Sequence, residues 1–114
     1  MNRQKFEALY SKVLEFWPSE IDVSKKKIFP EGGATIPNLV VEHDKAEAMA
    51  SKHFSNESQE VQTWAGLIDW SLYTILHKSA RVQGCRLVKV HEVSADDVIS
   101  ECLKNDKYAS DWEL

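Results

Sequence analysis

The stretch from Val61 to Val82 constrains the fold most strongly, because its spacing predicts one long helix with two apolar faces. At about 100° per residue, one stripe collects eight apolar residues: Val61, Trp64, Ala65, Ile68, Leu72, Ile75, Leu76 and Val82. Trp70 and Tyr73 point in another direction. A helix that is apolar on both sides is either the buried centre of its domain or a docking surface for a partner. The sequence alone leaves both interpretations open.

The length and composition predict a single globular domain over residues 1–114. Apolar residues make up 43% of the chain and charged residues 28%, so disorder over the whole length is not expected. The last ten residues, 105–114, combine acidic and aromatic side chains. We predict that they form a flexible tail or a tail that docks.

Three further segments have helical spacing or helix-start signals. Residues 2–17 carry an apolar stripe from Phe6 onward, and Pro18 ends that helix. Pro37 suits the first turn of a second helix that continues to residue 54. Ser94 and Asp97 form a capping-box pattern at the start of the last helix. With the long helix, about four helices are predicted.

The best strand candidate is residues 85–93, which follow the helix-ending Gly84 and are rich in β-branched side chains. Residues 21–29 and 34–36 form either a loose hairpin or an irregular connection. The predicted fold class is therefore α+β, with about four helices around a long central helix and a small antiparallel sheet. An all-α domain is the alternative.

The charge and the absence of long apolar runs restrict the classes of partner. The net charge of −4 argues against a general nucleic-acid binder, which needs a basic face to neutralise phosphates. The run Lys25-Lys26-Lys27 is interpreted as a solvated turn. No segment reaches the roughly 20 apolar residues of a membrane span, and the start of the chain lacks an apolar leader core. We therefore expect a cytoplasmic protein that binds neither nucleic acid nor membrane.

The patterns for metal, phosphate or catalytic chemistry are weak. His43 and Glu47 would share one helix face, but three or four converging ligands are the rule and HExxH is absent, so no metal site and no cofactor are predicted. Gly32-Gly33 is interpreted as a turn rather than a phosphate loop. Cys85 with His91 meets only the minimal requirement for a nucleophile and its base. We predict no catalytic residue and expect that the protein is not an enzyme.

The second face of the long helix is the main candidate for a binding site. Trp70, Tyr73 and His77 recur at i, i+3 and i+7, so they share one side of the helix. Gly66 lies one turn before Trp70 and leaves a notch, while Asp69 adds charge. Tryptophan and tyrosine are frequent anchors of protein interfaces, although the same face would be covered if the helix were central.

The end of the chain repeats this combination of aromatic and acidic side chains. Asp111, Trp112 and Glu113 lie in the predicted tail. Exposure of an indole to water is costly, which favours docking of Trp112 on the domain itself or on a partner.

These observations predict a small acidic protein-binding module that inhibits or escorts one specific protein by steric occlusion, in the manner of an immunity protein or a phage-encoded inhibitor. Its predicted contacts are Trp70, Tyr73, His77, Asp69, Asp111, Trp112 and Glu113. Self-association as a homodimer would use the same aromatic face. The alternative hypothesis is a small enzyme or ligand-binding domain that uses Cys85 and His91.

Overall fold

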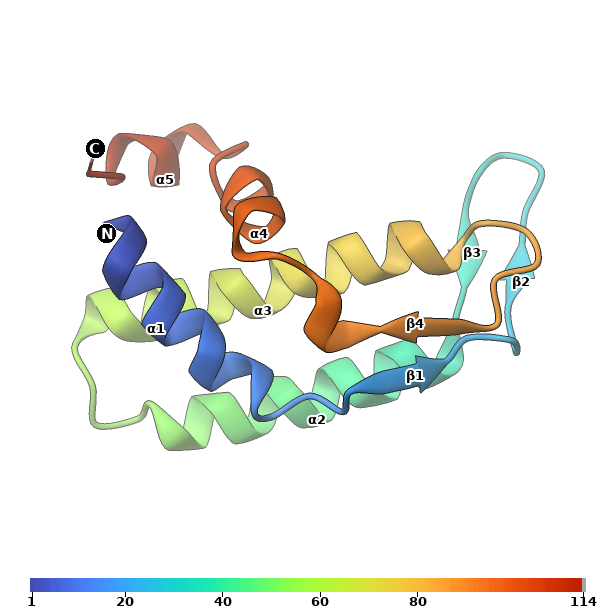
Figure 1. Cartoon of the computed structure of the whole chain (residues 1–114), viewed down its shortest axis with the longest axis horizontal. Coiled ribbons are helices and arrows are strands. Elements are labelled where there is room, and N and C mark those ends of the chain that lie inside the picture. The colour runs from blue at the N-terminus through green and yellow to red at the C-terminus, as the bar shows by residue number, and fades with distance from the viewer. Residues whose placement is uncertain (114) are drawn as a thin grey trace.

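Two long helices, α2 (Pro37–His53) and α3 (Gln59–Ala80), lie side by side and form the frame of the molecule (Figure 1). The structure is a computed structural model and describes residues 1–113. Pro37 occupies the first turn of α2, and Ser58 caps α3 by accepting a hydrogen bond from the backbone N–H of Val61. A short connection reverses the chain between the two helices, so they run antiparallel.

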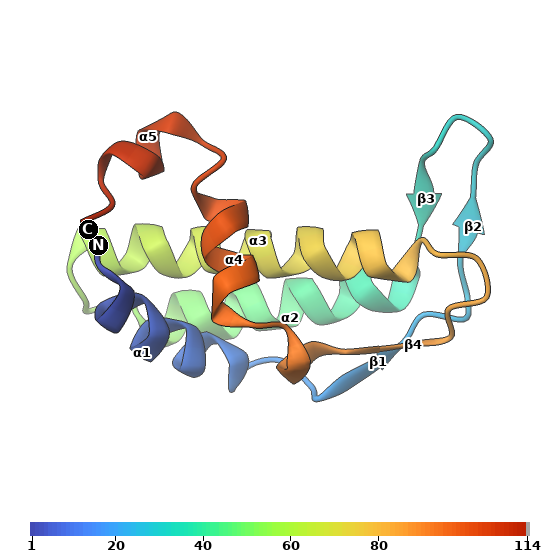
Figure 2. The same ribbon diagram turned by 45° about the horizontal axis from the view of Figure 1, so that its top comes forward.

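Helix α3 is the central element, because α1, α2 and α4 all pack against it. Helix α1 (Arg3–Leu14) begins at the Asn2 cap, and α4 (Ala95–Cys102) begins at Ser94, whose hydroxyl accepts the N–H of Asp97. Helix α5 (Asp106–Ser110) follows as a single short turn. Met1 and Glu113 meet beside α1, where the backbone N–H of Glu113 donates to the carbonyl of Met1 (Figure 2).

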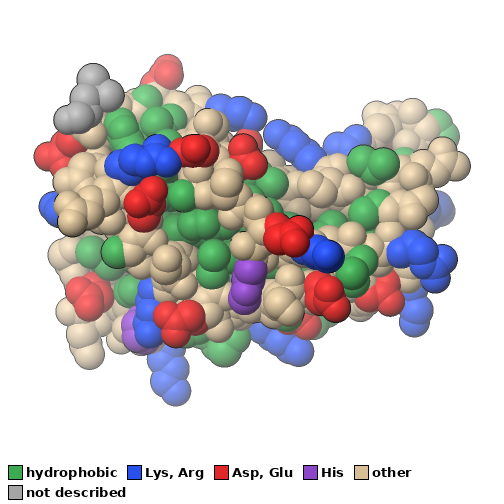
Figure 3. All heavy atoms as spheres, in the orientation of Figure 1, with side chains coloured by type: hydrophobic (Ala, Val, Ile, Leu, Met, Phe, Trp, Pro, Cys, Tyr) green, Lys and Arg blue, Asp and Glu red, His purple; other side chains and the backbone are tan. Residues whose placement is uncertain are grey.

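Four short strands form two separate antiparallel pairs. Strand β1 (Glu20–Asp22) pairs with β4 (Leu87–Lys89), with Ile21 opposite Val88. Strand β2 (Lys27–Ile28) pairs with β3 (Ala34–Thr35) in a hairpin that projects from the end of the molecule opposite the termini (Figure 2). Figure 3 shows Lys and Arg side chains gathered at this hairpin end.

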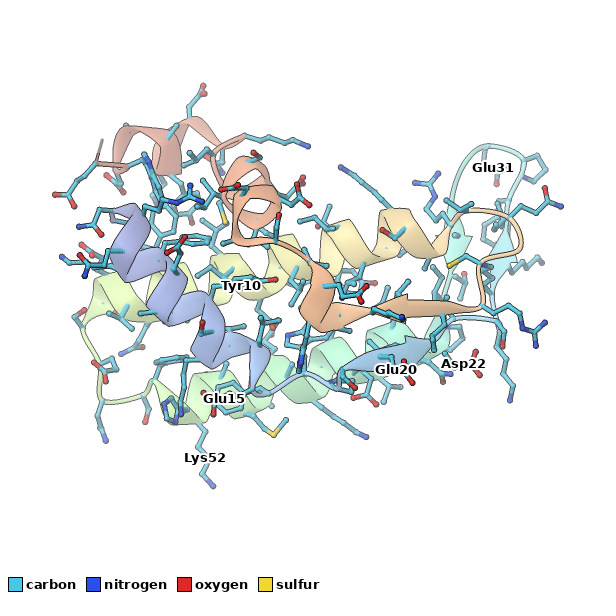
Figure 4. All side chains as sticks on the ribbon, viewed as in Figure 1. Tyr10, Glu15, Glu20, Asp22, Glu31 and Lys52 are labelled. Atoms are coloured by element: carbon cyan, nitrogen blue, oxygen red, sulfur yellow. The ribbon has the colours of Figure 1, made fainter. Side chains whose placement is uncertain are left out.

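One apolar core joins the helices to the β1–β4 pair. It fills the space between α1, α2, α3 and α4, and its largest fully buried apolar side chains are Phe6, Ile36, Leu39, Ile68, Leu72 and Leu76. Tyr10 reaches from α1 toward the segment before α4 (Figure 4), where its hydroxyl donates to the carbonyl of Val93 at 2.6 Å. No helix within residues 1–113 is long and apolar enough to cross a bilayer.

The predicted α+β class and the long central helix are confirmed. The predicted strand over residues 85–93 is too long, because the chain turns into a short 3-10 helix at Val90–Glu92. The N–H of Val90 bonds to the carbonyl of Ser19, and the N–H of Val93 closes a turn back onto Val90. Helix α5 was also not predicted; it gives five α-helices among the residues that the structure describes.

Candidate functional site

A buried histidine lies where α2 faces α3. The His43 residue is only 3% exposed, although it belongs to a helix whose neighbouring turns expose several charged groups. Its ring stacks on Tyr73 at 4.4 Å between centroids and meets Trp70 edge-on at 4.5 Å. Trp17 closes a third side at 6.0 Å. Three aromatic side chains from outside α2 therefore fix the position of one imidazole.

The charged partner of this histidine is Asp69 on α3, which is 1% exposed. The indole Nε1–H of Trp17 donates to Asp69 Oδ1 at 2.8 Å. The other oxygen, Oδ2, lies 3.0 Å from His43 Nε2. Glu47, one helical turn after His43, places its Oε2 3.4 Å from the same nitrogen. An imidazole and two carboxylates from two helices thus converge on one point.

Two atoms at this point lack a hydrogen-bond partner within residues 1–113. They are His43 Nε2 and Asp69 Oδ2, which are close to each other but do not have the alignment of a hydrogen bond. Buried polar atoms are nearly always paired, since an unpaired one loses its interaction with water without replacement. The donor atoms of His43, Glu47 and Asp69 all lie within 4.8 Å of one another, so together they could hold a metal ion.

A hollow of about 270 Å³ opens beside this cluster. Nine residues of α2, α3 and their connection line it: Glu47, Ala50, Ser51, Phe54, Gln62, Ala65, Gly66, Asp69 and Trp70. A Cβ added at Gly66 would meet no atom within 4 Å apart from the glycine itself, its two chain neighbours and the backbone of its own helix turn. The predicted notch beside Trp70 therefore corresponds to open space in the structure.

The aromatic face of α3 is partly packed and partly open. Trp70 is 54% exposed, while Tyr73 and His77 are half-buried. The rings of Trp70 and Tyr73 are 5.8 Å apart, and those of Tyr73 and His77 are 6.0 Å apart. Each of the two interpretations of this helix, a buried centre and an exposed docking surface, therefore applies to a different side chain. Tyr73 packs on His43, while Trp70 also reaches solvent.

The charge complementarity predicted for Asp69 does not agree with its position. Its carboxylate is buried between Trp17 and His43, so its charge is not presented at the outer surface. The exposed carboxylate on this side of the molecule belongs to Glu47, whose side chain is 48% exposed. The sequence places Asp69 directly before Trp70 on α3. It could not show that Asp69, which points about 100° away from Trp70 around the helix, faces the interior.

The three tail residues are held by the N-terminal end of the chain. Trp112 packs on Phe6 at 5.7 Å and on Trp64 at 6.1 Å. The amino group of Met1 donates to the carbonyl of Asp111 at 2.9 Å and lies 3.7 Å from the carboxylate of Glu113. Trp112 thus docks on its own domain, which was one of the two predicted outcomes. Up to Glu113, the tail does not contact the aromatic face of α3 formed by Trp70, Tyr73 and His77.

Cys85 and His91 have separate surroundings. The Cys85 thiol contacts the carbonyl of Leu87, whereas His91 Nε2 lies 3.1 Å from the carbonyls of both Leu14 and Trp17 at the end of α1. The second thiol, Cys102, is buried beside the Ser71 hydroxyl, and burial raises its pKa to about 11. This arrangement adds no support to a cysteine–histidine site.

Lys26, from the basic run, has a structural contact. Its ammonium group donates to the carbonyls of Ala80 at 2.6 Å and Val82 at 3.1 Å, and also to that of Cys85. A cation at the carboxyl end of a helix satisfies carbonyls that have no partner within the helix. Lys26 thus fastens the β2–β3 hairpin segment to the end of α3.

Sequence reasoning missed the buried pair of His43 and Asp69. One signal was present, since His43 falls on the apolar stripe of its helix with Leu39, Ala46 and Ala50. Comparison of the chain with protein-family models, with curated proteins and with solved structures finds no match.

Proposed function

We propose that this chain binds one specific partner protein through the surface formed by Trp70, Tyr73, His77 and the adjoining hollow, here called the Trp70 face. The single observation that carries the proposal is the large exposed fraction of Trp70, 54%, on a ring that is otherwise fixed by its neighbours. Binding at this face would inhibit or escort the partner by covering part of its surface.

The packing beneath Trp70 supports this proposal. The indole contacts His43 edge-on at 4.5 Å and Tyr73 at 5.8 Å, so both buried and half-buried rings support it. A side chain that is already held in place loses little conformational freedom on binding. Exposed tryptophans of this kind are enriched among residues that dominate the binding free energy of interfaces.

The hollow and the charges beside it indicate the chemistry of the partner. The hollow next to Trp70, with a volume of about 270 Å³, is large enough for one side chain of a partner and is lined by both polar and apolar residues. Glu47 lines this hollow with an exposed carboxylate, and the whole chain has a net charge of −4. A basic residue beside an apolar anchor on the partner would complement this surface.

Site-specific photo-crosslinking tests the proposal. A photoreactive phenylalanine analogue replaces Ser51, an exposed residue that lines the hollow beside Trp70, in one variant and Val82 in the other, so that both variants keep Trp70. Val82 is 62% exposed on the segment just after α3 and serves as the matched control. We expect the analogue at position 51, in native lysate, to give one dominant adduct that the analogue at position 82 does not give. The partner, once purified, should bind Trp70→Ala at least about tenfold more weakly than the wild type.

Two outcomes would contradict the proposal. Identical adducts from both positions would show non-specific contact, and no adduct at either position in a folded variant would leave the Trp70 face without a partner. A cross-link to a second copy of this chain would instead identify the face as a homodimer interface, which sedimentation of the wild type and Trp70→Ala would check.

A further inference from the structure

Two of the distances between the ligand atoms of His43, Glu47 and Asp69 match those found between ligands of one metal ion. His43 Nε2 lies 3.0 Å from Asp69 Oδ2 and 3.4 Å from Glu47 Oε2. With metal–ligand bonds of about 2.1 Å, neighbouring ligands are about 3.0 Å apart at right angles and about 3.4 Å apart at the tetrahedral angle. Both distances therefore match adjacent ligands of one ion.

The two buried ligand atoms are the ones that lack a hydrogen-bond partner within residues 1–113. His43 Nε2 and Asp69 Oδ2 belong to residues that are 3% and 1% exposed. A cation between them would satisfy both atoms at once. Asp69 Oδ1 is already occupied by the indole N–H of Trp17, which orients the carboxylate as outer partners of metal ligands commonly do.

We propose that His43, Glu47 and Asp69 bind one divalent transition-metal ion of the zinc class. One imidazole nitrogen and two carboxylate oxygens suit Zn²⁺, Mn²⁺ or Fe²⁺, whereas Mg²⁺ and Ca²⁺ favour oxygen ligands alone. His43 and Glu47 are four residues apart on α2, so one helix face presents both, and α3 supplies the third ligand.

The hollow adjoins two of the three proposed ligands. Glu47 and Asp69 both line it, and its volume of about 270 Å³ exceeds that of several water molecules. The side chain of Glu47 is 48% exposed, whereas the other two ligands are buried. A site with three protein ligands and an accessible fourth position leaves room for water or a small anionic ligand.

A proton is the competitor of the metal ion at this point. A protonated imidazole between the same two carboxylates, enclosed by Trp17, Trp70 and Tyr73, would form a purely structural ion pair. The two alternatives differ in whether the protein binds a metal ion, because only a neutral imidazole can act as a ligand.

Calorimetric titration of Zn²⁺ into untagged, chelator-treated protein distinguishes them. We expect one Zn²⁺ per chain, and we expect Co²⁺ to produce visible absorption bands that Zn²⁺ abolishes by competition. Glu47→Gln should weaken Zn²⁺ binding by about tenfold or more. The matched control is Glu42→Gln, which makes the same charge change on the same helix outside the cluster and should bind Zn²⁺ like the wild type.

Glu47 is exposed, so its substitution leaves the core intact and the test remains decisive even if His43 variants do not fold. Binding that is absent in the wild type, or equal in Glu47→Gln and Glu42→Gln, overturns the proposal and identifies the cluster as a structural ion pair. The titration uses the isolated protein, so its failure is independent of the cross-linking result for the Trp70 face.

Discussion

At the scale of single residues, Trp17 connects three parts of the structure. Its indole N–H donates to Asp69 Oδ1 at 2.8 Å, and its ring packs against His43. Trp17→Phe keeps an aromatic ring but removes this donor from a buried carboxylate. We expect the free energy of unfolding to fall by about 2–3 kcal/mol, measured by urea denaturation.

Tyr10→Phe is the matched control for this substitution. It also removes one hydrogen bond, from the Tyr10 hydroxyl to the carbonyl of Val93, but the acceptor is neutral and the expected loss is about 1 kcal/mol. A loss for Trp17→Phe no greater than that for Tyr10→Phe would contradict the role assigned to the Trp17–Asp69 contact.

Tyr10 also makes the stability depend on alkaline pH. Burial, with a smaller effect of the nearby Asp97 charge, raises the pKa of Tyr10 from 10.0 to about 12. Between these values the unfolded chain has released a proton that the folded chain keeps, so the unfolded state binds fewer protons and the free energy of unfolding decreases as pH rises.

Urea denaturation between about pH 9 and 11 checks this dependence. The raised pKa of Cys102, about 11, acts in the same direction and is present in both proteins. Tyr10→Phe should therefore show a shallower decline of stability than the wild type. Equal slopes would mean that Tyr10 ionises alike in the folded and unfolded states.

At the scale of elements, the carboxyl end of α3 depends on a side chain from a distant loop. Lys26 donates to the carbonyl of Ala80, the last residue of α3, and to that of Val82 just after the helix. Lys26→Met keeps most of the aliphatic stem and removes these bonds, so we expect a loss of about 1–2 kcal/mol in the free energy of unfolding.

The neighbouring Lys25 provides the control, because its side chain is exposed. Lys25→Met should change the stability by no more than about 0.5 kcal/mol. The same loss of stability for both substitutions, in thermal and urea denaturation, would contradict this role. It would mean that Lys26 stabilises the fold through its positive charge alone and not through its hydrogen bonds to the end of α3.

Local sequence signals determined most helix boundaries but not the ends of the strands. Pro37 starts α2 and Ser94 caps α4, and both act through backbone groups within one turn. Strand β4 instead stops at Lys89, where the chain turns into the 3-10 helix Val90–Glu92, and its partner strand β1 lies far away in the sequence. No periodicity within residues 85–93 carries that information.

The candidate site was predictable to the same limited degree. The helical spacing correctly placed Trp70 and Tyr73 on one side of α3. It could not show which side chain of α2 would lie opposite them, since that depends on how the two helices pack. The pairing of His43 with Asp69 is therefore a property of the α2–α3 contact and not of either helix alone.

At the scale of the whole molecule, the tail and the Trp70 face play different parts. Trp112 is half-buried against Phe6 and Trp64, whereas Trp70 is 54% exposed. Trp112→Ala should lower the free energy of unfolding by about 2–3 kcal/mol, because it removes part of an aromatic cluster that joins both ends of the chain.

Trp70→Ala makes the same chemical change at the exposed position and should cost about 1 kcal/mol or less. Thermal denaturation of the two variants compares them directly. A larger loss for Trp70→Ala than for Trp112→Ala would show that Trp70 serves mainly to support the core, and that would also weaken the proposed role of the Trp70 face.

The unequal exposure of the four tryptophans gives the molecule an optical property of its own. Trp17 and Trp64 are 3% and 2% exposed and Trp112 is half-buried, so Trp70 is the indole most open to an aqueous fluorescence quencher. Quenching of the natural fluorescence by acrylamide should therefore report mainly on one ring. Any ligand that covers that ring should reduce the quenching by acrylamide, so its binding can be measured on the unlabelled chain.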